Sequence, residues 1–527
     1  MKKRFLAGIL VLCMVVLALT GCGNSASNAG APVQNSANDA AAQNASAENS
    51  PVANDEKTLT IALTSEFDNF DPFTSQTMQF VDTLNFNVYE CLFHIDEDMN
   101  YAMDLATSYE QPDETTYIFH LREGVKFHNG EPFTAADVVY TIETIEDESV
   151  GAWRVSQYNN VASVTALDDY TVEIKLANPQ PAFLDNLAYT AIVSKSSTPA
   201  ELIKEPIGTG AFKFVSWTPN DNITLEKNPE YWEADQVTLD KIVIKFIPDP
   251  TVAITNLKSG DVQYFGMIDA ETASQIMDTE GLKVYSSKFA NSVYEIEVGR
   301  HNHPALADPE VMRAMFLAFD RQTVVDAVFA GMGSVTQSTF PSAANYYYAA
   351  DTEGYDLDKA KEVLSATNFA DGFDFTVIVS STDSTSQQAM TIWQNDLKKI
   401  GINMDINLVD SSIWLDEYLG RTYDMITNSY SMVGTDPATY CNVLLGALKD
   451  YQTADLTELN ELIQKGATTM DQDARAEIYQ QIQIILAQYR PVSSYAECVA
   501  LNGAVDSLNN IMVNGMGHTV LKYATMG

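Results

Sequence analysis

The hydrophobic positions from residue 58 onward follow two different periods. Apolar side chains alternate with other residues in 58–63 and in 117–121, which predicts a strand in each segment. Asn129-Gly130 predicts a turn soon after the second of these strands. In 402–408 the apolar residues alternate with Asn and Asp, so this segment predicts a strand with one buried face.

Helical periods fill segments between such strands. Thr134 and Asp137 predict a capping box, and the helix behind them would bury one face, made of Val138, Val139, Ile142 and Ile145. Asp308-Pro309-Glu310 predicts a second helix start, because it supplies an N-cap, a proline at the first helical position and an acid in the first turn. The apolar stripe of this helix is made of Met312, Met315, Phe316 and Phe319. A methionine stripe can form an adaptable binding surface, but we favour packing into the core.

The later half of the chain continues in the same way. Residues 386–400 predict a helix that stops at Gly401, and residues 455–489 predict two helices that end before Pro491. Helices and strands therefore alternate, which favours an α/β fold. No repeat of solenoid period is visible in the sequence.

The N-terminus carries a different pattern. Lys2, Lys3 and Arg4 precede an apolar run that extends to Leu19, which is typical of an export signal. The run is short for a membrane span, which needs about 20 residues. It ends in Leu19-Thr20-Gly21-Cys22, which resembles the lipobox of bacterial lipoproteins. We therefore expect residues 1–21 to be a lipoprotein signal peptide and Cys22 to carry the lipid.

Residues 22–56 are rich in Ala, Ser, Asn and Gln and have almost no large apolar side chains. Such a segment buries too little apolar surface to offset its ordering entropy, so we expect a disordered tether. The whole chain has 527 residues, which is too long for a single hydrophobic core. More than one domain is therefore expected after the tether.

Net charge limits the classes of partner that the protein can bind, and the number of cysteines limits the disulfides that it can form. The formal net charge of −41 at pH 7 repels nucleic acid and anionic lipid, so we expect no nucleic-acid partner. A solvated surface is favoured over one that attracts basic peptides or cations. Beyond Cys13 and Cys22 the chain has Cys91, Cys441 and Cys498, for which one disulfide and three buried thiols both stay open.

Enzyme and metal motifs are missing from the sequence. It contains no His-Glu-x-x-His, Gly-x-Ser-x-Gly or Walker-type lysine motif, so we predict no catalytic residue and no cofactor. The two histidines of His301-Asn302-His303 could form a weak metal-binding pair, but a solvated loop is the favoured interpretation. We therefore predict no metal site. A pair of acids for glycoside chemistry stays open, because 71 acids make any one pair uninformative. Gly208-Thr209-Gly210 predicts a backbone crossing or a tight turn.

One long block, residues 121–140, is the most specific motif: Leu-Arg-Glu-Gly-Val-Lys-Phe-His-Asn-Gly-Glu-Pro-Phe-Thr-Ala-Ala-Asp-Val-Val-Tyr. Other blocks accompany it along the chain: Asp71-Pro72, Tyr89-Glu90-Cys91-Leu92-Phe93, Gly208-Thr209-Gly210-Ala211-Phe212, Asn228-Pro229-Glu230-Tyr231-Trp232, Ser259-Gly260-Asp261, Arg313-Ala314, Asp320-Arg321, residues 355–360 and Asp436-Pro437. With these blocks, nearly everything from Thr58 to the C-terminus resembles family 5 of the extracytoplasmic solute-binding proteins of ABC importers, the oligopeptide-, dipeptide- and nickel-binding type.

The resemblance implies an α/β, two-lobed periplasmic-binding-protein-like fold of the class with an extra subdomain, with mixed sheets flanked by helices and a hinge between the lobes. Lobe I would comprise residues 57–88, 209–287 and 500–527, and lobe II would comprise residues 288–499. The extra subdomain of lobe I would occupy residues 89–208. A ligand that contacts both lobes only when they are closed would shift the population to the closed form.

The resemblance also implies a function. The chain would be a monomeric receptor, lipid-anchored to the outer face of the cell membrane, that captures oligopeptides or a similar solute. It would deliver them to an ABC permease without breaking a bond. Two alternatives stay open: a secreted hydrolase with an acidic dyad, and a sensory peptide receptor on the same fold.

The family's binding residues carry over only in part. Peptide-binding members place an aspartate for the peptide α-amine where this chain has Val433, and dipeptide binders place an arginine near residues 380–385, where this chain has none. A buried ion needs a partner, so a zwitterionic dipeptide is disfavoured relative to a longer peptide or a neutral ligand such as a glycan. A helix cap is favoured for Asp436 over amine binding. The predicted ligand-binding residues are Gln76, Met78, Asn291, Ser292, Tyr430, Val433 and Asp436.

Overall fold

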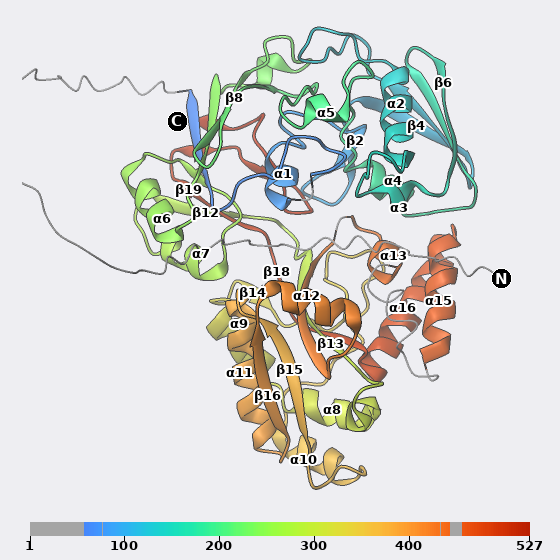
Figure 1. The fold of residues 1–527 in the computed structure, drawn as a ribbon, viewed down its shortest axis with the longest axis vertical. Coiled ribbons are helices and arrows are strands. Elements are labelled where there is room, and N and C mark those ends of the chain that lie inside the picture. The colour runs from blue at the N-terminus through green and yellow to red at the C-terminus, as the bar shows by residue number, and fades with distance from the viewer. Residues whose placement is uncertain (1–56, 76, 433, 443–455) are drawn as a thin grey trace, which may run out of the picture.

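The chain folds into two lobes, each built on one mixed sheet (Figure 1). The structure is a computed structural model, and it describes residues 57–75, 77–432, 434–442 and 456–527. We call the lobe with the seven-stranded sheet the upper lobe and the lobe with the six-stranded sheet the lower lobe, as they lie in Figure 1. The α/β, two-lobed architecture predicted from the sequence is confirmed.

The sheet of the upper lobe has the order β12-β19-β11-β1-β10-β9-β8. Its strands are β1 (Thr58–Leu63), β8 (Phe212–Thr218), β9 (Asn222–Lys227), β10 (Lys241–Phe246), β11 (Tyr264–Phe265), β12 (Leu282–Ser286) and β19 (Leu501–Val505). β1 lies parallel to β10 and β11 in the centre, and its residues Leu59, Ile61, Ala62 and Leu63 are buried. The helices of this part are α1 (Met78–Thr83), α6 (Pro250–Ser259), η1 (Ala234–Gln236) and α7 (Ala270–Met277).

A separate four-stranded sheet of order β4-β5-β7-β6 extends the upper lobe. It consists of β4 (Ala106–Asp113), β5 (Thr116–Leu121), β6 (Val161–Asp168) and β7 (Thr171–Leu176). Its neighbouring elements are β2 (Phe93–Ile95), β3 (Tyr101–Met103), α2 (Ala135–Glu146), α3 (Val155–Tyr158), α4 (Phe183–Leu187) and α5 (Pro199–Leu202). We call this sheet with α2, α3 and α4 the four-stranded subdomain.

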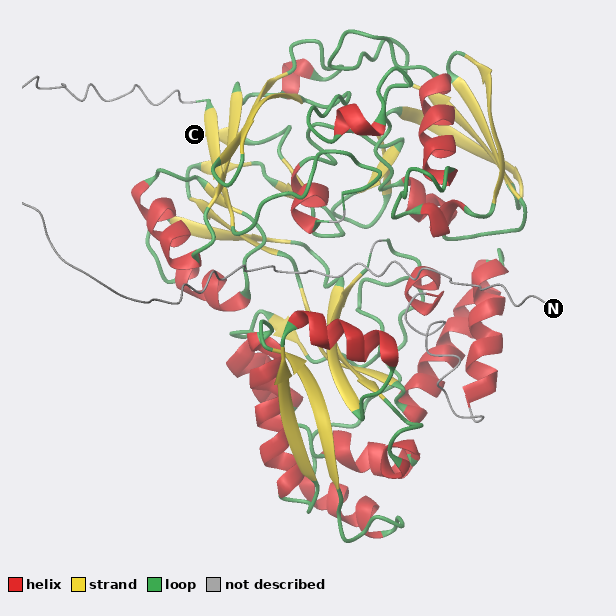
Figure 2. Cartoon of the chain, in the orientation of Figure 1, coloured by secondary structure: helices red, strands yellow, loops and turns green. Residues whose placement is uncertain are grey.

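The sheet of the lower lobe has the order β14-β18-β13-β17-β15-β16. Its strands are β13 (Ser292–Val298), β14 (Gly333–Ser334), β15 (Asp374–Ser380), β16 (Asn403–Val409), β17 (Met425–Ser431) and β18 (Val492–Cys498). Figure 2 shows helices around these strands. They are η2 (Pro304–Ala307), α8 (Pro309–Leu317), α9 (Arg321–Val328), α10 (Leu357–Ser365), α11 (Ser384–Lys398), α12 (Ser411–Gly420), α13 (Pro437–Tyr440), α15 (Thr457–Thr468) and α16 (Gln472–Tyr489).

The chain passes between the two sheets at two places. It leaves the upper sheet after Ser286 and enters the lower sheet at Ser292, and it returns between Cys498 and Leu501. After β19, short strands complete the upper lobe: β20 (Leu508–Asn509), β21 (Met512–Val513), β22 (Thr519–Val520) and β23 (Thr525–Met526). The residue boundaries that we assign to lobe I, lobe II and the subdomain stay a prediction.

Local sequence signals locate several elements correctly. Thr134 and Asp137 form the predicted capping box at the start of α2, and the Asp308 carboxylate accepts a hydrogen bond from the Glu310 N–H at the start of α8. The stripe that begins with Met312 is fully packed into the core, so it is no binding surface. α15 and α16 match the two helices predicted in 455–489.

The strand predicted in 402–408 is real, but its buried face is shorter than expected. Ile402 and Met404 are buried, whereas Leu408 is 50% exposed. β16 lies at the edge of the lower sheet, where it pairs with β15 alone, and burial of its apolar face decreases from Met404 through Ile406 to Leu408. The expectation of a uniformly buried apolar face is therefore wrong at Leu408.

Two further expectations are resolved. A Cβ added at Gly208 would lie 2.0 Å from the Val88 carbonyl oxygen, so this glycine marks a backbone crossing. Cys91, Cys441 and Cys498 are all free thiols, and the first two are buried.

Among the residues that the structure describes, none of the helices has both the length and the apolar character that a membrane crossing requires.

Candidate functional site between the lobes

Several predicted ligand-binding residues lie where the chain crosses between the lobes. Asn291 directly precedes β13, and its side-chain amide donates a hydrogen bond to the Met516 carbonyl of the upper lobe at 2.6 Å. Ser292 starts β13 opposite Ser431 of β17, and their hydroxyl oxygens are 2.7 Å apart. The structure thus brings Asn291 and Ser292 to the end of the lower sheet that faces the upper lobe. Their contact with ligand stays a prediction.

Tyr430 projects from the opposite face of the same strand pair. Tyr430 pairs with Val293, which is the next position along the strands from the Ser292–Ser431 pair. Neighbouring residues of a strand point to opposite faces of the sheet. Its ring packs edge-on against Tyr440 of α13, with 4.7 Å between the centroids. The half-buried Tyr430 ring is therefore held by a neighbouring aromatic and still reaches the surface.

A buried acid, Glu295, lies next to Tyr440 of this aromatic pair. The Tyr440 hydroxyl donates to the Glu295 carboxyl at 2.7 Å, and the Asn428 amide lies 3.4 Å from it. Burial, and then repulsion by Glu297, raises the pKa of Glu295 to about 8. Glu295 is therefore mostly protonated at pH 7, which lowers the free-energy cost of burying it beneath the site.

Asp436 behaves as the helix cap that the sequence favours. One carboxylate oxygen accepts a hydrogen bond from the Ala438 N–H at 2.9 Å, at the start of α13. Both oxygens also pair with the Arg475 guanidinium of α16, at 2.6 and 2.9 Å. The pair is almost completely buried, with 7% of Asp436 and 3% of Arg475 exposed. Since these partners already engage the carboxylate, Asp436 is poorly placed to hold a ligand's amine.

The other predicted positions lie outside the described residues or on α1 of the upper lobe. Gln76, Val433 and the lipid-attachment residue Cys22 lie outside the described residues. Met78 is the first residue of α1 in the upper lobe. The ligand contacts expected for Gln76, Met78 and Val433 therefore stay predictions.

Sequence reasoning missed a buried acid that several family motifs surround. Glu90 accepts hydrogen bonds from the Thr209 hydroxyl at 2.7 Å, the Tyr231 hydroxyl at 2.9 Å and the Trp232 indole N–H at 3.0 Å. Burial raises the pKa of Glu90 to about 7, with Asp104 adding to the shift. The sequence held a signal for this cluster, because Glu90 and its three donors all lie in the blocks that carry the family resemblance. These blocks therefore contribute to the packing of the upper lobe.

The histidine pair is engaged with backbone carbonyls. His301 Nε2 lies 3.1 Å from the Arg421 carbonyl oxygen, and His303 Nε2 lies 3.1 Å from that of Asp374. Carbonyl oxygens only accept, so these ring nitrogens carry protons and do not present lone pairs to a metal. Within the described parts of the chain, no three or more His, Cys, Asp or Glu side chains are grouped to hold an ion.

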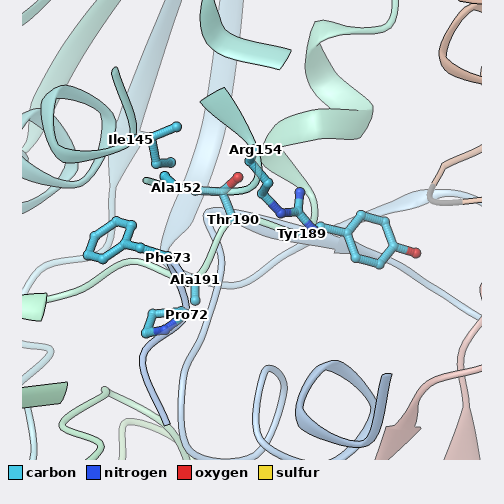
Figure 3. Close-up of a pocket in the computed structure, with 8 residues that line it drawn as sticks. All are labelled: Pro72, Phe73, Ile145, Ala152, Arg154, Tyr189, Thr190 and Ala191. Atoms are coloured by element: carbon cyan, nitrogen blue, oxygen red, sulfur yellow. The ribbon is translucent and has the colours of Figure 1, made fainter. Parts of the chain in front are cut away.

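A small pocket lies in the upper lobe between the loop that contains Phe73 and the segment around Arg154 and Tyr189 (Figure 3). It has room for about one water molecule. A peptide or another solute of comparable size does not fit in it. A more open depression near Asp374 and Asp424 lies on the lower sheet, at the ends of β15 and β17 opposite to the Ser292–Ser431 pair.

Comparison with known proteins gives a consistent result. The family model described as bacterial extracellular solute-binding proteins, family 5 Middle, matches residues 100–452. The glutathione-binding protein GsiB of Pectobacterium atrosepticum is 29% identical over 373 residues, which cover 69% of this chain and 72% of that protein.

Solved structures share the fold over most of the chain. The substrate-binding protein CtaP of Listeria monocytogenes has a TM-score of 0.79 at 23% identity, covering 89% of this chain and 99% of its own. The oligopeptide-binding protein AppA of Bacillus subtilis, in complex with a nonapeptide, has a TM-score of 0.72 at 24% identity, with coverage of 89% and 99%. At these identities the likeness shows the fold alone.

Proposed function

Because the chain belongs to family 5 of the bacterial extracellular solute-binding proteins, we propose that it captures oligopeptides between its two lobes and delivers them to a membrane permease. Members of this family are extracytoplasmic binding proteins of ABC importers and not enzymes. The proposal adds the ligand class and the mode of attachment to the membrane. Its physical basis is a population shift, in which the ligand favours the closed form by the difference between its affinities for the closed and open forms.

The partners of Asp436 are the observation that supports an oligopeptide over a dipeptide as the ligand. A dipeptide has two terminal charges close together, and each needs a partner when it is buried. The carboxylate of Asp436 already pairs with Arg475 and caps α13. Longer peptides can be held by hydrogen bonds to their main chain instead, with side chains such as Tyr430 stacking on the ligand. The name of AppA, a structural relative, also describes an oligopeptide-binding protein.

Native mass spectrometry of the purified full chain tests the ligand class. We expect adducts whose released masses fragment as unmodified peptides of more than two residues. Adducts that fragment as glycans, or the protein mass with no adduct, would contradict the proposal. A hydrolase with an acidic dyad would instead convert an added peptide or glycan to products during incubation.

A substitution at Val433 tests whether the terminal amine lacks an ionic partner. We predict that Val433→Asp raises the affinity for peptides with a free amine by about 10-fold, because the new carboxylate would pair with that amine. Titration calorimetry with the peptide released from the protein, in free and N-acetylated forms, measures the difference. Equal affinities of the variant for both forms would reject the predicted alignment at Val433.

The proposed anchor is the lipid on Cys22. We predict that Cys22→Ser moves the protein from the membrane fraction to the soluble fraction and abolishes incorporation of a labelled fatty acid. Cys13→Ser is the matched control, since Cys13 lies inside the predicted signal peptide. Retention of labelled Cys22→Ser in the membrane would contradict the lipid assignment.

A further inference from the structure

Asp185 is a buried acid at a contact between the two lobes. It lies on α4 of the four-stranded subdomain, and only 3% of it is exposed. Opposite it are residues 434–436 of the lower lobe, which lead into α13. Figure 1 shows α13 directly beneath α3 and α4, to one side of the chain segments that connect the lobes.

Hydrogen bonds from both lobes converge on the Asp185 carboxyl. From the lower lobe, the Asp436 backbone N–H donates to Oδ2 at 2.6 Å, and the Thr435 hydroxyl lies 3.4 Å from the same oxygen. From the upper lobe, the Tyr101 hydroxyl donates to Oδ1 at 2.5 Å. Asp185 therefore connects the subdomain to the lower lobe through backbone as well as side-chain groups.

The backbone at Gly434 is shaped for this contact. A Cβ added there would lie 2.7 Å from both the Cβ and Oδ2 of Asp185. Such distances are too short for ordinary packing, so any larger residue at Gly434 would push the two lobes apart. The close approach and the hydrogen bonds are two separate features that point to the same contact.

The charges around Asp185 make its burial unfavourable when it is ionised. Asp436 faces it from the lower lobe, and Arg475 pairs with Asp436. Tyr101 and Tyr189, which are neutral at physiological pH, face it from the upper lobe. Burial, and then repulsion by Asp436, raises the pKa of Asp185 to about 6.

We propose that Asp185 is an acid-sensitive latch of lobe closure, which docks on the backbone of residues 434–436 only when the lobes are shut. In an open form the carboxyl would be hydrated and its pKa would approach the ordinary value of 3.8. The closed form then binds the proton more tightly. Closure becomes more favourable as the pH falls through about 6, and this gain is lost as the pH rises above it.

The size of the effect follows from these two pKa values. Between pH 7 and pH 5 the ratio of closed to open protein should rise on the order of 10-fold. Above pH 7 it should be constant, because the carboxyl is then ionised in both forms. The latch acts without ligand, so its test is independent of the proposed peptide function.

Distances between two spin labels report the closed fraction directly. Leu167 of β6 and Leu408 of β16 are about half exposed and lie in different lobes, so Leu167→Cys and Leu408→Cys provide the labels. Cys13, Cys22 and the half-buried Cys498 are replaced by serine in the same chain, whereas Cys91 and Cys441 are buried. Double electron–electron resonance on the full chain without added peptide, at pH 5 and pH 7.5, gives the populations of short and long distances.

Three variants at the contact have distinct expected results. Asp185→Ala shifts the protein to the long distance at both pH values, because the acceptor is gone. Asp185→Asn keeps a hydrogen-bonding group without a charge, so its closed fraction stays high and no longer depends on pH. Gly434→Ala opens the lobes, and adding Asp185→Ala to it opens them no further. Asp147→Ala, an exposed acid of the same subdomain, is the matched control and leaves the wild-type pH profile unchanged.

Several outcomes would overturn the latch. They are a wild-type closed fraction that is the same at pH 5 and 7.5, an Asp185→Asn variant that keeps the wild-type pH profile, and additive opening by Gly434→Ala and Asp185→Ala. If Asp185→Ala fails to fold, the pH profile of Asp185→Asn decides the question alone.

Discussion

Glu90 and Asp185 are two buried acids of the upper lobe that differ in where their hydrogen-bond donors come from. Each is at most 4% exposed, and burial is the main reason that the pKa is raised, to about 7 for Glu90 and about 6 for Asp185. All the donors to Glu90 belong to the upper lobe, whereas Asp185 has donors from both lobes.

The difference separates stability from conformational change. A buried acid with donors from one lobe stabilises that lobe in every state of the protein. A buried acid with donors from two lobes keeps all of these donors only when the lobes are closed, so it affects the balance between open and closed forms. The following predictions test whether this division is correct, starting with the lower-lobe support of the Asp185 contact.

We expect the largest effect from Arg475→Met. It leaves the Asp436 carboxylate buried without its cation, which costs about 3–5 kcal/mol of unfolding free energy. Arg313→Met is the matched control, because Arg313 pairs with Glu310 and Glu353 at a more exposed site and should contribute about 1 kcal/mol or less. Urea unfolding followed by circular dichroism measures both. Equal losses for the two variants would contradict the buried role of Arg475.

Glu90→Ala should have the next largest effect, about 3 kcal/mol, because it leaves three buried donors without an acceptor. Glu90→Gln should cost about 1 kcal/mol or less, since the amide resembles the protonated acid. The folded pKa of about 7 lies above the ordinary value of 4.5. Wild-type stability should therefore fall as the pH rises from 4.5 to 7, and Glu90→Gln should lack this contribution.

The same urea titrations at pH 5 and pH 7 measure this pH dependence. Neither Glu90 variant should change the closed fraction reported by the spin labels. A change in closure at unchanged pH would show that Glu90 and Asp185 do not differ in the way proposed.

The smallest effect is expected at Tyr430. Tyr430→Ala should weaken binding of the peptide released from the purified protein by about 10-fold, which corresponds to about 1.4 kcal/mol of aromatic stacking. Tyr430→Phe should bind within about 2-fold of wild type, because it keeps the ring. Titration calorimetry measures both affinities. If Tyr430→Ala binds as tightly as wild type, the Tyr430 ring does not stack on the ligand.

Local features were predictable from the sequence because their partners are near in the chain. The Thr134 capping box joins residues three positions apart, and the α8 start needs only Asp308 and its successors. Leu408 was misjudged, because alternation reveals a strand but not whether the strand lies at a sheet edge.

The contacts of Asp185 and Glu90 are long-range and were not predictable in this way. Asp185 meets Asp436 across 251 positions, and Glu90 meets Thr209 across 119. For Glu90 the family motifs gave a usable signal, since its donors belong to the same blocks. Asp185 lies outside those blocks, and only the fold places it against Gly434.

Small-angle X-ray scattering tests the central claim, that two lobes shut around a guest and leave it unchanged. The protein is measured after its own peptide has been removed by mild denaturation and refolding, and again after that peptide is restored. The account predicts a smaller radius of gyration with the peptide, which is recovered intact afterwards. A radius that stays the same at saturation, or a peptide recovered as fragments, would contradict it.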